Sequence, residues 1–118
     1  MEQQIYSMTQ KDLAEQLVGR TIASIEGNKI TLSNGTVLEI EDTEDCCAWY
    51  EGNLEAFDYK DNIITSVQEV PVDPTRPGAV DAWTLRVLSA HTVIAKINVE
   101  GDPTSGYYCH SVNLRIKK

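Results

Sequence analysis

Residues 83–99 read WTLRVLSAHTVIAKINV, and this stretch decides the class of fold that the sequence predicts. Apolar and polar side chains alternate over 83–87 and again over 93–99, which is the period of a β-strand with one buried face. The second alternation is broken only at Ile94, and residues 89–91 separate the two runs as a turn. Because no long helix lies between the runs, they are predicted to pair as antiparallel strands.

A second group of strands is predicted over residues 20–41. Apolar and polar residues alternate over 30–32 and again over 38–40. Gly27-Asn28 and Asn34-Gly35 are two-residue turn signals, and Asn-Gly is expected in a type I′ hairpin because both residues tolerate positive φ. This region therefore predicts a three-stranded antiparallel meander with one face packed on the core and one face exposed to solvent.

A helix is predicted over residues 10–18, before these strands. Thr9 is a good N-cap, and Asp12 follows three residues later, as in a capping box with aspartate in place of glutamate. Met8 and Leu13 fit a hydrophobic staple around this cap. Because a helix this short is not stable alone, its apolar stripe is expected to pack on the sheet.

The remaining segments carry weaker signals. Asn53 is expected to cap a short turn over 54–57, and strand character returns over 62–70. Prolines mark residues 71–80 as a loop, which is longer than the usual connection of about four to six residues. A last alternation over 107–116 predicts another strand with one apolar face.

Together these elements predict a single domain over residues 1–118 of the α+β class. A short N-terminal helix is expected to pack on a curved, mostly antiparallel sheet of six to eight strands, which could close into a barrel. Residues 1–8 are expected to lead loosely into the helix.

The charge of the chain is acidic and unevenly distributed. The 118 residues include 18 Asp or Glu against 10 Lys or Arg, a net charge of −8, and the acidic run over residues 39–58 holds eight acids and no base. Such a surface repels phosphates, so nucleic-acid binding is not expected. No apolar run approaches the roughly 20 residues that span a bilayer, and the N-terminus lacks the pattern of a signal peptide. The sequence therefore predicts a protein that acts inside a cell, with no membrane partner.

Two segments with unusual side chains, residues 45–50 and 105–110, are expected to meet in space and to form a binding surface fringed by carboxylates. Aromatic side chains are enriched at the energetic centres of protein interfaces, and carboxylates favour a basic partner. In a strand, however, half of these aromatic side chains would face the core. The candidate binding residues are Asp42, Glu44, Asp45, Cys46, Cys47, Trp49, Tyr50, Tyr107 and Tyr108.

The cysteines allow a second kind of site, a zinc centre formed by Cys47, Cys109 and His110. The ligand types suit zinc, but adjacent ligands on strands point apart, whereas a Cys-x₂₋₄-Cys turn aims both sulfurs inward. A cysteine nucleophile is not expected either, because nearby carboxylates raise the pKa of a thiol and disfavour the thiolate. No catalytic residue and no cofactor are predicted.

The order of several elements resembles a family of small bacteriophage and prophage proteins of unknown function. These elements are Leu17-Val18-Gly19-Arg20, a hairpin with Asn34-Gly35, Asp45-Cys46-Cys47, a later tryptophan strand and Ser105-Gly106-Tyr107-Tyr108. The resemblance extends over roughly residues 13–115, and its most specific parts are the Asp-Cys-Cys and Gly-Tyr-Tyr elements. It implies a phage origin and a similar fold but no activity. Any role of Cys109 or His110 falls outside the resemblance, because this chain departs from the family pattern there.

The leading hypothesis is a small acidic phage accessory protein that is not an enzyme and that binds a host protein with a basic surface in the host cytoplasm. A host-takeover or anti-defence role would follow. One alternative is a small-molecule or nucleotide-binding protein, which would require arginines such as Arg76, Arg86 or Arg115 to converge. The other is a zinc-binding structural domain. The sequence leaves a homo-oligomer open.

Overall fold

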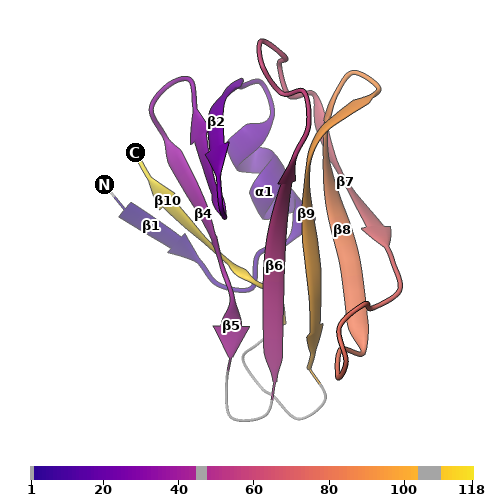
Figure 1. Cartoon of the computed structure of the whole chain (residues 1–118). Helices are drawn as coiled ribbons and strands as arrows, with labels where there is room; N and C mark the ends of the chain where they lie inside the picture. Colours follow the sequence, from indigo (N-terminus) through magenta and orange to yellow (C-terminus); the bar gives the residue numbers. More distant parts are fainter. Residues whose placement is uncertain (1, 45–47, 104–109) are drawn as a thin grey trace.

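The computed structural model describes residues 2–44, 48–103 and 110–118, which form two five-stranded sheets and one helix, α1 (Gln10–Leu17). Sheet 1 has the spatial order β1 (Glu2–Ile5), β10 (Asn113–Lys117), β4 (Val37–Glu41), β3 (Lys29–Leu32) and β2 (Ile22–Glu26). Sheet 2 has the order β5 (Thr43–Glu44), β6 (Trp49–Ala56), β9 (Thr92–Asp102), β8 (Asp81–Ser89) and β7 (Ser66–Pro71). The sheets lie side by side with α1 behind and between them (Figure 1).

The predicted combination of a short helix with antiparallel strands is confirmed, because every pairing in both sheets is antiparallel. The predicted single sheet of six to eight strands is wrong. The described residues form ten strands in two sheets, and these sheets do not close into a barrel.

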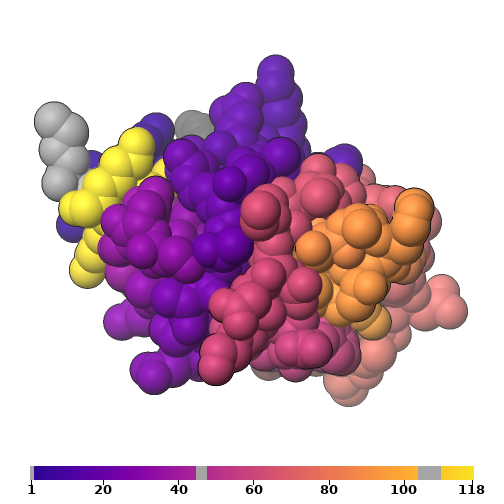
Figure 2. Space-filling model, turned by 90° about the horizontal axis from the view of Figure 1, so that it is seen from above, coloured from indigo at the N-terminus to yellow at the C-terminus, as the bar shows by residue number. Residues whose placement is uncertain are grey.

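The chain passes from sheet 1 to sheet 2 at Asp42, between the end of β4 and the start of β5. Seen from above, β10 (yellow) and the β8–β9 turn (orange) lie at opposite sides of the molecule (Figure 2).

The cap of α1 forms as its sequence predicts. The Thr9 hydroxyl accepts a hydrogen bond from the Asp12 N–H, and the Asp12 carboxylate accepts one from the Thr9 N–H. Leu13 and Leu17 are buried on the face that packs toward β7, and the Gln10 amide donates to the Val67 carbonyl oxygen. The helix therefore covers the β7 end of sheet 2 and is held by packing rather than by its own length.

The predicted meander is confirmed as β2, β3 and β4, but the type I′ turn at Asn34-Gly35 is wrong. Only Gly35 has a positive φ there, of 93°. Its N–H donates to the Leu32 carbonyl, and the Asn34 side chain accepts from the Thr36 N–H. A four-residue connection thus replaces the two-residue turn, because the asparagine side chain supplies a local acceptor.

Three further expectations are corrected. The N-terminal segment is not loose, because β1 pairs with β10 along its whole length. The short turn expected over 54–57 is instead the end of β6, where Leu54 lies opposite Ile97. The strand expected over 62–70 begins only at Ser66, because Ile64 is buried and its N–H donates to the Arg20 carbonyl.

The inner faces of both sheets and α1 enclose one continuous apolar core. Gly52 of sheet 2 lies close against sheet 1, since a Cβ there would stand 2.7 Å from the Cγ2 of Ile40. The break in alternation at Ile94 is a β-bulge: Val87 lies opposite Ala95 and Leu88 opposite Val93, with Ile94 between them. This bulge lets Ile94 and Ala95 both be buried.

Candidate functional site

Three of the candidate binding residues, Asp42, Glu44 and Trp49, lie together where the chain enters sheet 2. Glu44 of β5 lies directly opposite Trp49 of β6 in the antiparallel register. The Asp42 carboxylate accepts a hydrogen bond of 3.0 Å from the Gly52 N–H of the same strand β6. Asp42 and Glu44 are exposed, so this corner of the molecule presents carboxylates beside an aromatic ring.

Tyr50 does not belong to this surface. Its side chain is only 2% exposed and lies in the core, with its ring centroid 5.6 Å from that of Trp83. Its hydroxyl donates to the Asp81 carboxylate at 3.3 Å. Strand alternation explains the difference, because Trp49 and Tyr50 are neighbours on β6 and must point to opposite faces.

The described residues that flank the two unusual segments do approach each other. The Thr43 hydroxyl donates to the Ser111 carbonyl at 2.8 Å, and Trp49 lies opposite Asp102. His110 is exposed, and its N–H donates to the Ser7 hydroxyl. Six of the predicted site residues lie outside the described residues: Asp45, Cys46, Cys47, Tyr107, Tyr108 and Cys109. Within residues 2–44, 48–103 and 110–118, no group of three His, Cys, Asp or Glu side chains could hold a metal ion.

The acidic run is divided between the two sheets. The Glu41 carboxylate lies on sheet 1 and pairs with the Arg115 guanidinium at 3.0 Å, and Glu39 lies opposite the same arginine in the β4–β10 register. Glu51 and Glu55 lie instead on β6, on the face of sheet 2 that points away from the core. The described residues of this run are therefore shared between sheet 1 and sheet 2.

The outward face of sheet 2 carries a hollow of about 460 Å³ between β6, β9, β8 and the loop of residues 72–80. We call it the acidic hollow. Four carboxylates line it together with Asn, Thr and apolar groups, and these carboxylates belong to Glu51, Glu55, Asp73 and Glu100. A chain of hydrogen bonds crosses its floor, from the Thr84 hydroxyl to the Asn98 oxygen at 2.8 Å and from the Asn98 amide to Glu55 at 2.6 Å.

Hydrogen bonds and an ion pair hold the loop of residues 72–80 against this face. The Glu100 carboxylate accepts hydrogen bonds from the N–H groups of Thr75 and Arg76 and from the Thr75 hydroxyl. Arg76 forms an ion pair with Glu51, and its guanidinium carbon lies 5.2 Å from the centre of the Trp49 ring. Sequence alone indicated a long loop here, but not that carboxylates on β6 and β9 hold it.

These donors affect the acidity of Glu100. The N–H of Thr75 is the main reason that the pKa of the Glu100 carboxyl is lowered below its ordinary value of 4.5. Burial opposes this by raising the pKa, while the Thr75 hydroxyl and the N–H and charge of Arg76 lower it further. Hydrogen bonds to the charged form favour that form, so the loop contact is strongest when Glu100 is ionised.

A second hollow of about 350 Å³ adjoins the first on the same face, and the two share Val72 and Thr84. We call it the apolar hollow. Its walls are the side chains of Phe57, Val70, Val72 and Val93, and its charged groups are Arg86 and Lys96. The three arginines named from the sequence do not all converge, because Arg115 lies on sheet 1 and Arg76 pairs with Glu51. Sequence reasoning missed this hollow, since it depends on the register of β8 against β9.

A family model described as a domain of unknown function, DUF7448, matches residues 15–114. No match was found among curated proteins or among solved structures. Among the described residues, no helix has both the length and the apolar character needed to cross a membrane.

Proposed function

The chain belongs to the DUF7448 family of domains of unknown function, and we propose that it is a non-enzymatic binding domain whose partner is a protein with a basic surface. The observation that carries this proposal is the acidic hollow, in which four carboxylates surround a space of about 460 Å³ on the outward face of sheet 2. The resemblance to small phage proteins supports a host protein as the partner and the host cytoplasm as the place of action.

Charge complementarity indicates which partner segment fits. The side chains of Lys and Arg carry the charge that four carboxylates attract, and their long stems can lie along apolar surface. Glu51 and Glu100 already hold the loop of residues 72–80, so Glu55 and Asp73 are the carboxylates most available to a partner. Asp42, Glu44 and Trp49 extend the same surface toward β5.

The expected affinity is moderate and depends on salt. An exposed ion pair contributes only about 0.2–1 kcal/mol, so a basic segment needs several such contacts to bind. The Debye length is about 8 Å at physiological ionic strength, which screens the attraction beyond the first contacts. We therefore expect the acidic hollow to give selectivity and rapid association more than high affinity.

Peptide binding tests the proposal. A fluorescent peptide with alternating Lys and Ala residues, followed by anisotropy, should bind the protein, and a peptide with Glu in place of Lys should not. The double variant Glu55→Gln/Asp73→Asn should weaken binding about tenfold, from the loss of two charged contacts.

The matched control is Glu15→Gln/Glu26→Gln, which changes the net charge equally on exposed positions of α1 and β2. It should weaken binding less than about twofold, through the net charge alone. Equal losses in the two double variants would show that the peptide responds to total charge, and the acidic hollow would then not be the binding site.

A further inference from the structure

The apolar hollow contains two positive charges that face each other. Arg86 of β8 and Lys96 of β9 are directly opposite in the antiparallel register and point outward from sheet 2. Within the part of the chain that the structure describes, neither side chain forms an ion pair with an acid. The Lys96 ammonium instead lies 5.5 Å from the centre of the Phe57 ring. Like charges directly opposite on a sheet are destabilising, so an anion bound between them would remove a cost that the free protein carries.

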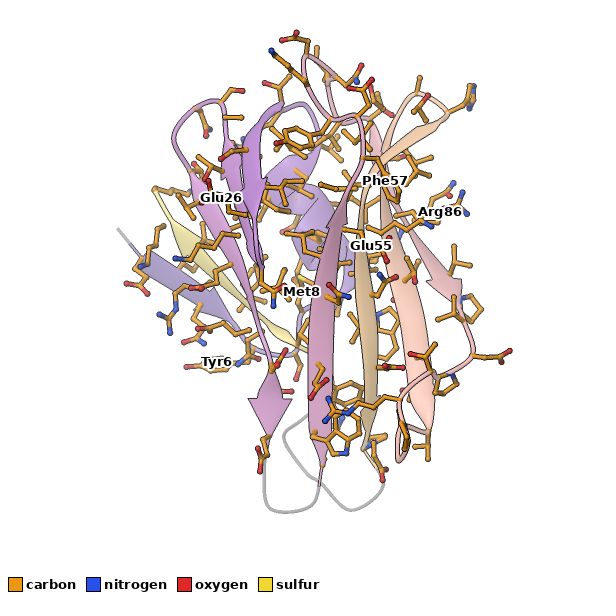
Figure 3. All side chains as sticks on the ribbon, in the orientation of Figure 1. Tyr6, Met8, Glu26, Glu55, Phe57 and Arg86 are labelled. Atoms are coloured by element: carbon orange, nitrogen blue, oxygen red, sulfur yellow. The ribbon has the colours of Figure 1, made fainter. Side chains whose placement is uncertain are left out.

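The surroundings of the two cations are mainly apolar. Phe57 is 45% exposed and Val72 is 44% exposed, although both are large apolar side chains, and Val70 and Val93 complete the walls. Figure 3 shows Phe57 at the upper end of β6 and Arg86 projecting from β8. Both lie away from Met8, which is in the interior of the molecule. A volume of about 350 Å³ lies at the lower end of the range for small-molecule sites, roughly 300–1,000 Å³.

The nearby charges limit the ligand to one negative charge. Glu55 lies opposite Lys96 on the other side of β9, and its carboxylate accepts from the Asn98 amide. Gln68 lies opposite Arg86 and is uncharged. Two cations beside one carboxylate leave a local charge of about +1, within a protein of net charge −8. A phosphate dianion would be repelled by Glu55 and by the acidic hollow next to it.

We propose that the apolar hollow binds a small organic monocarboxylate with an apolar body. Its carboxylate lies between Arg86 and Lys96, where the guanidinium can donate two parallel hydrogen bonds. Its hydrocarbon part lies against Phe57 and Val72 and removes their apolar surface from water. This site adjoins the acidic hollow but attracts charge of the opposite sign, so it does not rest on the proposed function.

A ligand series on the unaltered protein tests this directly. Octanoate, titrated into isotopically labelled protein and followed by NMR, should shift the resonances of Phe57, Val72 and Val93 in a saturable way. Octan-1-ol, which lacks the charge, and acetate, which lacks the hydrocarbon, should each bind at least about tenfold more weakly. Octylammonium should not compete with octanoate for these residues.

Variants then separate the two halves of the site. Arg86→Gln/Lys96→Gln should abolish the preference for octanoate over octan-1-ol but leave weak binding of octan-1-ol. Phe57→Ala should weaken both ligands. Lys11→Gln/Lys60→Gln, on exposed residues of α1 and the segment after β6, is the charge-matched control and should preserve the octanoate preference.

Three outcomes would overturn the proposal. The first is the absence of a saturable shift with octanoate, and the second is equal affinity for octanoate and octan-1-ol in the unaltered protein. The third is tighter binding of a peptide that ends in a leucine carboxylate than of octanoate, because the hollow would then be a docking site for a protein terminus.

Discussion

Gly101 illustrates how a single residue of sheet 2 determines which side chains reach the surface. It lies on β9 opposite Tyr50 of β6 and Asp81 of β8. A Cβ at this position would stand 2.6 Å from the Cδ1 of the Tyr50 ring and closer still to the carbonyl oxygen of Trp49. The absence of a side chain on Gly101 therefore makes the space in which the Tyr50 ring is buried.

The substitution Gly101→Ala should destabilise the protein by about 1–3 kcal/mol, the usual cost of overpacking a filled core. The backbone oxygen of Trp49 cannot move aside as the end of a flexible side chain could. Urea unfolding followed by circular dichroism measures the change. Gln68→Ala, on an exposed position of β7, is the control and should change stability by less than about 0.5 kcal/mol. A Gly101→Ala protein as stable as that control would mean that Tyr50 repacks freely.

The same residue shows a limit of sequence reasoning about the site. Alternation predicts that one of Trp49 and Tyr50 faces the core, but it does not say which one. The choice is made by contacts between strands that are far apart in sequence, because Gly101 provides space on one face of the sheet only. For the same reason the facing pair of Arg86 and Lys96 could not be found before the register of β8 and β9 was known.

At the scale of the elements, local signals predict the structure well. The cap of α1, the strands of the meander and the β8–β9 pair follow from patterns within a few residues of each other. The elements that were missed or misplaced depend on distant partners. The strand β1 has few apolar residues and forms because it pairs with β10. The strand β6 extends to Ala56 because it pairs with β9 as far as that residue.

The loop of residues 72–80 provides a prediction about pH. The pKa of Glu100 is lower in the folded protein than its ordinary value, so its contacts with Thr75 contribute fully to stability above about pH 4.5. That contribution is lost as the pH falls through the lowered pKa, because the carboxyl is then protonated. Glu100→Gln should therefore be less stable than the unaltered protein at pH 7, and the difference should shrink at pH 3.

Urea unfolding at both pH values measures this difference. Glu69→Gln, which removes an exposed carboxyl from β7, is the matched control, and its effect should be smaller than that of Glu100→Gln at pH 7. If Glu100→Gln were destabilised by the same amount at pH 3 as at pH 7, ionisation of Glu100 would not be what holds the loop.

At the scale of the whole molecule, the two sheets have separate backbone ladders but share one core. The division at Asp42 ends the hydrogen-bonded ladder of sheet 1 and begins that of sheet 2. Buried side chains from both sheets nevertheless belong to one cluster, and Ile40 of sheet 1 lies against Gly52 of sheet 2. Sequence patterns could not reveal this division, because the strands on its two sides alternate in the same way.

A shared core predicts that both sheets unfold in one transition, and the positions of the tryptophans allow a direct test. Trp49 and Trp83 are the two tryptophans of the chain, and both lie in sheet 2. Leu38→Ala, in the fully buried part of sheet 1, should lower the free energy of unfolding by about 2–5 kcal/mol. Tryptophan fluorescence during urea unfolding should report that full loss, although the mutated residue is in the other sheet.

Circular dichroism, which reports both sheets, should give a midpoint that coincides with the fluorescence midpoint. Val37→Ala, on the outward face of the same strand, is the control and should shift both midpoints much less. A fluorescence transition that stays in place while the dichroism midpoint falls in Leu38→Ala would mean that sheet 2 folds without sheet 1. The outward face of sheet 2, with its acidic and apolar hollows, would then persist after sheet 1 has unfolded. Coincident midpoints would instead tie the integrity of both hollows to the packing of the whole chain.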